Sequence, residues 1–279
     1  MNPNNKVQSY LAHAKFHNEL NLDDNFILKG CIQMYHAFKD EKYRNIVLSH
    51  MNQIVDEDGI LKGYDPAAYH LTDVFAGQIL QFCYEESQEE KYKKARERFR
   101  TQLKKQPRLD NGNFAKTGES TGHICMMALY CSMPFYMFCE TKYGKKENYN
   151  DILTQFSNAR QALEDPASEY GDRARSMYMM ALVDTIEAMS QEIYEQYRML
   201  AGMLKTAVKE EMALKDRSLM GDAALAYCLA KSCRMELMLR EKYADLVMPM
   251  LEKLLAEDVE DRKLLGVIIM IYAQVVRVY

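Results

Sequence analysis

The sequence predicts an all-α protein that folds as an (α/α)6 barrel, a closed ring of six helical hairpins, and we expect a single domain over residues 1–279. Three observations support this prediction. The 279 residues include only 12 glycines and 6 prolines, about half the usual share of roughly 12%. A short phrase recurs about every fifty residues, and apolar segments alternate with amphipathic ones along the chain.

The recurring motif is an acidic residue followed by Lys and Tyr, and its tyrosine occurs at Tyr43, Tyr92 and Tyr243. Looser copies occur at Tyr149 and Tyr194, so that successive tyrosines are 49, 57, 45 and 49 residues apart. A period of this size accommodates two helices and their turns. Such a recurrence is typical of stacked helical hairpins.

The two segments of each repeat unit differ in polarity. Segment 90–105 has ten charged residues among sixteen, while its apolar residues from Tyr92 to Leu103 recur at steps of three and four. Segment 124–139 has fourteen apolar residues among sixteen, which is too short to cross a bilayer but suits a helix that is buried on every side. Segments of the first kind are predicted to form outer helices, and segments of the second kind inner helices.

Each inner segment is followed by an outer one, and five such pairs can be counted. They are 23–39 with 41–55, 70–86 with 90–105, 120–142 with 147–163, 170–189 with 192–210, and 219–239 with 241–256. The last apolar segment, 264–276, can pair with a helix around Val7 to Leu20. We expect a closed ring because an open array would expose the apolar faces of its end repeats. The connections from outer to inner helices then share one end, where we expect a ligand-binding funnel.

Composition excludes several classes of function. The chain has 36 Lys and Arg against 40 Asp and Glu, a net charge of -4, and no long block of like charge, so neither a nucleic acid nor a membrane is expected as a partner. The seven cysteines lack the spacing of a zinc site, and we expect them to be reduced core residues. No metal-ligand spacing or glycine-rich phosphate loop stands out, so no cofactor is expected. No export signal is visible, and a cytoplasmic location is expected.

Several phrases occur in one order over most of the chain. They are LKGCIQMYHAFKDEKY with VDEDGILKGY, GQILQFCYEESQEEKYKKA followed by QLKKQPR and NGNF, MALYCSMPFY, RARSMYMMALVDTIE, and ALAYCLAKSCR. Together they resemble the unsaturated glucuronyl and rhamnogalacturonyl hydrolases, glycoside hydrolase families 88 and 105. The resemblance implies an (α/α)6 barrel that removes a terminal 4,5-unsaturated uronic acid from oligosaccharides. It also implies hydration of the vinyl-ether double bond, with an aspartate as general acid and base and no metal.

The catalytic aspartates that the resemblance implies fall on other residue types here. The first belongs to a Trp-x-Asp pattern ahead of an apolar run, and that pattern falls on Cys125 and Met127. The second lies five residues before Gly77 and falls on Thr72, with Asp73 one step away. One step along a helix turns a side chain by about 100°. Asp73 is the candidate for proton transfer, and the alternative is a first-turn acid that the helix dipole favours.

Two further candidates follow from the resemblance. Arg173 matches the family arginine of the fourth hairpin and is a candidate to bind the sugar, the alternative being an ion pair with Asp172 or Glu169. His123 aligns with a polar family position and is a second candidate for a catalytic residue. Its alternative is a capping or turn histidine.

The chain contains no tryptophan, although sugar-binding clefts usually rely on aromatic faces. Tyr64 and Tyr69 are therefore candidates to contact the substrate, and Tyr170 and Phe114 offer further rings. Asp222 is also a candidate for substrate binding, or else an ordinary acid at the start of an inner helix.

Two functions remain open on the sequence. One is an unsaturated uronyl hydrolase that acts on oligosaccharides. The other is a catalytically silent relative that serves as a sugar-binding or scaffold protein.

Overall fold

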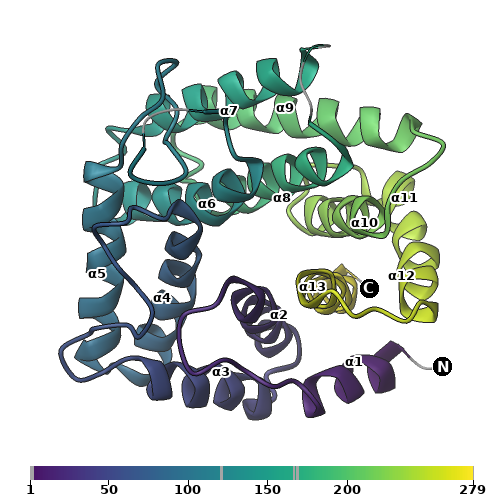
Figure 1. The fold of residues 1–279 in the computed structure, drawn as a ribbon. Coiled ribbons are helices and arrows are strands. Elements are labelled where there is room, and N and C mark those ends of the chain that lie inside the picture. The colour runs from purple at the N-terminus through teal and green to yellow at the C-terminus, as the bar shows by residue number, and fades with distance from the viewer. Residues whose placement is uncertain (1–2, 120–121, 166, 168–169, 279) are drawn as a thin grey trace. The chain divides into compact units, whose positions relative to one another are not determined.

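The computed structural model describes residues 3–119, 122–165, 167 and 170–278, and this part of the chain is mostly helical (Figure 1). Within it, β pairing is confined to two isolated bridges, Val55 with Leu61 and Arg108 with Phe114. The all-α class predicted from the sequence is confirmed. Of the helices in the described ranges, none has the length and apolar character needed to cross a membrane.

The chain divides into two compact units. Unit 1 lies within residues 1–64, 79–95 and 217–279, and unit 2 within 65–78 and 96–216. The predicted single domain over 1–279 stays a prediction. Unit 1 contains α1 (Pro3–Ala12), α2 (Leu22–Phe38), α3 (Glu41–Ile54), most of α4 (Ala76–Ser87), the start of α5 (Glu90–Lys105), α10 (Leu219–Arg234), α11 (Arg240–Tyr243), η2 (Ala244–Leu246), α12 (Val247–Ala256) and α13 (Arg262–Val278). Unit 2 contains the 3-10 helix η1 (Leu71–Phe75), the first turn of α4, the rest of α5, α6 (Met126–Lys142), α7 (Tyr149–Glu164), α8 (Asp172–Ala188) and α9 (Tyr194–Ala213).

Burial separates the helices into the two predicted kinds. In α6, 13 of 17 residues are buried, whereas in α7 only five of 16 are buried. The apolar residues of α5 that recur at steps of three and four are also buried, from Tyr92 at 1% exposure to Leu103 at 4%. Apolar content therefore predicted correctly which helices are inner and which are outer, because only an inner helix is covered on all of its faces.

The recurring tyrosine is among the first three residues of α3, α5, α7 and α9, whereas Tyr243 is the last residue of α11. Tyr43 and Tyr92 are buried, and the ammonium group of the preceding lysine lies over each ring, 4.8 Å and 5.4 Å from the ring centre. Tyr149 is buried as well, but Tyr194 is 67% exposed. The phrase therefore has a packing role in the copies where the ring enters the core.

Two glycines let helices of unit 1 approach each other closely. A Cβ atom on Gly266 of α13 would lie 2.6 Å from the backbone of Phe26 in α2. A Cβ atom on Gly30 of α2 would lie 2.9 Å from the side chain of Ile269. Glycine is required at these two positions because any side chain would push α2 and α13 apart.

Several predicted boundaries are wrong, and one of them is the end of the inner helix expected over 219–239, which lies at Arg234. The inner helix expected from residue 120 begins only at Met126, because Gly122 has a φ of 102° and Cys125 is extended. The N-terminal helix ends at Ala12 rather than near Leu20, because the following segment turns so that the backbone N–H of His17 binds Asp24. The helix expected over 241–256 is divided into α11, η2 and α12.

The cysteines are free, as predicted, and six of the seven are buried. Burial raises the pKa of Cys31 and of Cys139 to about 12. These two thiols are therefore protonated at neutral pH and behave as apolar core groups.

Candidate functional site

The candidate site lies in unit 2, where η1, α6 and α8 begin. η1 packs against α6, and α6 packs along α8 (Figure 1). The hydroxyl group of Tyr170, just before α8, donates to the backbone oxygen of Ile124, just before α6, at 2.6 Å. This hydrogen bond brings the starts of the two inner helices together.

Asp73 is the third residue of η1 and is half-buried. Its backbone N–H donates to the carbonyl oxygen of His70 at 3.1 Å, which closes the turn. Burial raises the pKa of Asp73 to about 6, and the nearby His70 opposes part of this increase. An aspartic acid in water has a pKa of about 3.9, so this carboxyl group exchanges its proton much closer to neutral pH. It is therefore suited to act as an acid and as a base.

The residues at the implied aspartate positions have no carboxyl group. Met127 lies half-buried in the first turn of α6, and Thr72 lies half-buried next to Asp73 in η1. Cys125 is the N-cap of α6, and its side chain makes no capping hydrogen bond. The start of α6 therefore supplies backbone dipoles to this region rather than a group that transfers protons.

His123 and Arg173 are both exposed at this end of unit 2. His123 directly precedes Ile124, whose carbonyl oxygen binds Tyr170, and Arg173 is the second residue of α8. Of the alternatives for Arg173, Asp172 pairs with Arg175 at 3.3 Å, and Glu169 lies outside the described residues. The structure thus brings the segments of both predicted residues together.

The aromatic candidates differ in exposure. Tyr69 is half-buried, has a φ of 51°, and has its ring 3.9 Å from the position that a Cβ on Gly118 would take. Phe114 is 5% exposed and packs against the guanidinium group of Arg108, so its ring is largely covered. Tyr64 belongs to unit 1 and is half-buried.

Asp222 also belongs to unit 1, at the start of α10, and is 5% exposed. Its two oxygens accept from Arg217 at 2.7 Å and from Lys253 at 2.8 Å. Burial raises the pKa of Asp222, but the hydrogen bonds from Lys253 and Arg217 outweigh burial and bring the pKa below its ordinary value. The carboxylate is therefore ionised and held by two cations.

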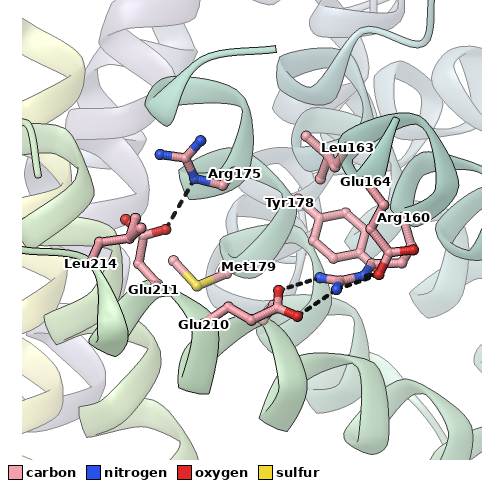
Figure 2. Close-up of a pocket in the computed structure, with 10 residues that line it drawn as sticks. Arg160, Leu163, Glu164, Arg175, Tyr178, Met179, Glu210, Glu211 and Leu214 are labelled. Atoms are coloured by element: carbon pink, nitrogen blue, oxygen red, sulfur yellow. Dashed lines mark hydrogen bonds and ion pairs between the residues drawn. The ribbon is translucent and has the colours of Figure 1, made fainter. Parts of the chain in front are cut away.

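A pocket of about 170 Å³ lies where α7, α8 and α9 meet in unit 2 (Figure 2). The residues that line it are Arg160, Leu163, Glu164, Arg175, Tyr178, Met179, Ala207, Glu210, Glu211 and Leu214. Arg175, rather than the predicted Arg173, faces this pocket. No spacing in the sequence indicated that Arg175 faces a pocket, because Arg175 and its partner Glu211 come from different helices.

Ion pairs occupy both polar walls of this pocket. Arg160 donates two hydrogen bonds to Glu210, at 2.6 and 2.7 Å, and one to Glu164 at 2.6 Å. On the other side, Arg175 donates to Glu211 at 3.3 Å (Figure 2). Burial and the nearby Asp172 raise the pKa of Glu211, while Arg175 opposes them. Because the two arginines already bind carboxylates, a ligand would meet mainly the apolar walls.

A second cavity, of about 230 Å³, lies in unit 1 between α1, α2 and α13. It is lined by Ser9, Tyr10, Leu11, His13, Ala14, Ile27, Arg262, Leu265 and Ile269. In the described ranges, no three His, Cys, Asp or Glu side chains are arranged to hold a metal ion.

Solved structures with the same fold are glycoside hydrolases. The chain is similar to a family 105 glycoside hydrolase from C. acetobutylicum ATCC 824, with 20% identity, a TM-score of 0.86, and coverage of 98% of this chain and 99% of that chain. It is also similar to a family 88 glycosyl hydrolase from Bacteroides vulgatus, with 11% identity, a TM-score of 0.74 and 99% coverage of each chain. A possible member of family 105 from Klebsiella pneumoniae is 13% identical, with a TM-score of 0.70 over 99% of this chain and 92% of that chain.

These similarities show the fold, and the (α/α)6 class predicted from the sequence is confirmed. No curated protein sequence matches the chain. The family model named Glycosyl Hydrolase Family 88 matches residues 2–171, which is more than half of the 279 residues. The chain therefore belongs to glycosyl hydrolase family 88.

Proposed function

We propose that the protein removes a terminal 4,5-unsaturated uronic acid from oligosaccharides by hydrating its vinyl-ether double bond. The observation that carries this proposal is Asp73, a half-buried carboxyl group with a pKa of about 6 in η1, which packs against the inner helix α6. Family membership supports a hydrolase of the unsaturated glycuronyl type. The cytoplasmic location expected from the sequence stays a prediction.

The reaction needs one proton and one water molecule. The protonated carboxyl group of Asp73 gives its proton to the alkene carbon, and the ring oxygen stabilises the positive charge that develops on the neighbouring carbon. The Asp73 carboxylate then takes a proton from water as the water oxygen bonds to that carbon. The resulting hemiketal opens to a ketone and leaves a hemiacetal at the anomeric carbon. This hemiacetal collapses to an aldehyde, which breaks the glycosidic bond and releases the rest of the oligosaccharide as an alcohol. A pKa of about 6 suits both steps, because each form of the acid is populated near neutral pH.

The sugar carboxylate requires positive groups beside Asp73. Arg173 at the start of α8 would supply one of them, together with the positive ends of the two helix dipoles. His123 stays a predicted catalytic residue. Tyr69, three residues before Thr72, is our candidate to contact the sugar face. Tyr64 and Asp222, in unit 1, stay predicted substrate contacts.

The alternative is a sugar-binding protein without catalysis. Met127 and Thr72 favour it, because neither can transfer a proton at the positions where the family resemblance implies aspartates. In this case the site would still bind an anionic sugar through Arg173 and the helix ends. Binding without turnover would then be the only measurable property.

Loss of the ultraviolet absorbance of unsaturated disaccharides, prepared with polysaccharide lyases, tests the proposal. The unmodified protein should consume at least one of them, and Asp73→Asn should abolish turnover while Asp110→Asn, a variant of an exposed loop acid, retains it. Calorimetric binding of these disaccharides without turnover would support the sugar-binding alternative instead.

A further inference from the structure

Two buried glutamines at the end of α5 hold the backbone that leads into η1. Gln102 is 3% exposed and Gln106 is 5% exposed. The side-chain amide of Gln102 donates to the carbonyl oxygen of His70 at 3.2 Å and to the side-chain oxygen of Gln106 at 3.0 Å. The amide of Gln106 donates to the carbonyl oxygens of Tyr69 and Ala115, each at 2.9 Å. We call these two residues the glutamine clamp.

The clamp binds the same carbonyl oxygen that closes the turn of Asp73. The oxygen of His70 accepts both from the Gln102 side chain and from the backbone N–H of Asp73 at 3.1 Å. The preceding residue, Tyr69, has a φ of 51°, which is costly for any residue except glycine. The hydrogen bond from Gln106 to the Tyr69 carbonyl holds this unusual conformation in place.

The clamp also joins two segments that come from different parts of the chain. Gln106 bridges Tyr69 in the first segment to Ala115 in the second. Backbone hydrogen bonds continue this pairing, from the N–H of Leu71 to Lys116 at 2.9 Å and from the N–H of Gly118 to Ala68 at 3.1 Å. The position of η1 is therefore set relative to the 115–118 segment as well as to α5.

Glutamine has the donors and the acceptor that the contacts at position 106 require. Its amide nitrogen donates two hydrogen bonds while its oxygen accepts one from Gln102, as the contacts require. An apolar residue would leave buried carbonyl oxygens without a donor, and a glutamate would place a negative charge against them. The segment QLKKQPR thus contains two glutamines, one in the last turns of α5 and one directly after it, whose hydrogen bonds the sequence pattern did not predict.

We propose that Gln102 and Gln106 are positioning residues for Asp73, which hold its carboxyl group in the orientation and half-buried environment that proton transfer needs. This inference rests on the proposed function of Asp73. The clamp acts through the backbone of Tyr69 and His70 and does not touch the carboxyl group itself.

The test is a ¹³C NMR titration of the Asp73 carboxyl group in the full chain, with its signal assigned by Asp73→Asn. Gln106→Met and Gln102→Met keep the side-chain length but remove the amide. We expect the pKa of Asp73 to fall by one unit or more in each, because a released η1 exposes the carboxyl group to water. Gln274→Met removes an equally buried amide in unit 1 and should leave the Asp73 titration unchanged.

If Gln106→Met prevents folding, the Asp73 carboxyl group is titrated in Gln102→Met and Gln106→His instead. An unchanged Asp73 titration in folded clamp variants would overturn the inference. In turnover assays we expect kcat to fall about 10- to 100-fold with a smaller change in KM, the scale of a misplaced catalytic group. If Asp73→Asn keeps full activity while the clamp variants still shift the Asp73 titration, the proposed function fails. The two glutamines would then still be shown to set the environment of the Asp73 carboxyl group.

Discussion

The hydroxyl group of Tyr170 donates to the backbone oxygen of Ile124 at 2.6 Å and thereby joins the segment before α8 to the segment before α6. Two inner helices of unit 2 therefore begin side by side, close to His123 and Arg173. Because the hydrogen bond is made by a side chain, it can be removed without changing the backbone.

Tyr170→Phe should destabilise unit 2 modestly and disturb the candidate site. The variant loses one hydrogen bond and keeps the ring, so we expect about 0.5 to 1.5 kcal/mol lower stability in urea unfolding. Sugar binding should weaken at the same time, because the starts of α6 and α8 are no longer linked. Tyr194→Phe, which alters a tyrosine that is 67% exposed, should change neither property.

Asp73→Asn should stabilise the protein above pH 6 and leave it unchanged near pH 3. With a pKa of about 6 in the folded state and about 3.9 unfolded, Asp73 binds its proton more tightly when folded, so it lowers stability as pH rises from 4 to 6. The asparagine variant avoids this loss. We expect a gain of about 1 to 2 kcal/mol at pH 8, reduced from the full shift because the group is partly solvated. Equal pH profiles of urea unfolding for both proteins would refute the raised pKa.

Gly266→Ala should destabilise unit 1. The added methyl group would lie 2.6 Å from the backbone of Phe26, so α13 and α2 must separate, at a cost of about 1 to 3 kcal/mol. The matched control is Gly202→Ala in α9, where no atom lies within 4 Å. That control should gain about 0.5 to 1 kcal/mol, because alanine favours a helix over glycine. Thermal unfolding of both variants measures the contrast.

Met127→Asp should be tolerated and should raise turnover. The residue lies half-buried in the first turn of α6, where the helix dipole favours a negative charge. It would restore a carboxyl group at the position where the family resemblance implies one. Initial rates on the unsaturated disaccharides should rise above those of the unmodified protein, and Met127→Asn, which lacks the charge, should show no increase.

The sequence predicted the positions of most helices because burial imposes a regular apolar pattern. It failed at the start of α6, where the positive φ of Gly122 has no trace in that pattern. The raised pKa of Asp73 could not be predicted either, because its burial results from tertiary packing. The glutamine clamp was invisible for a similar reason, since its partners are backbone carbonyls 32 and 37 residues away.

The most direct test of the proposed chemistry is the rate at which unsaturated disaccharides lose their ultraviolet absorbance, compared between the unmodified protein and Asp73→Asn. If Asp73 supplies the proton, the unmodified protein is active and its rate falls as pH rises through about 6, where Asp73 loses its proton, and Asp73→Asn has no measurable rate. Equal rates for the two proteins would contradict the assignment of Asp73 as the acid and base.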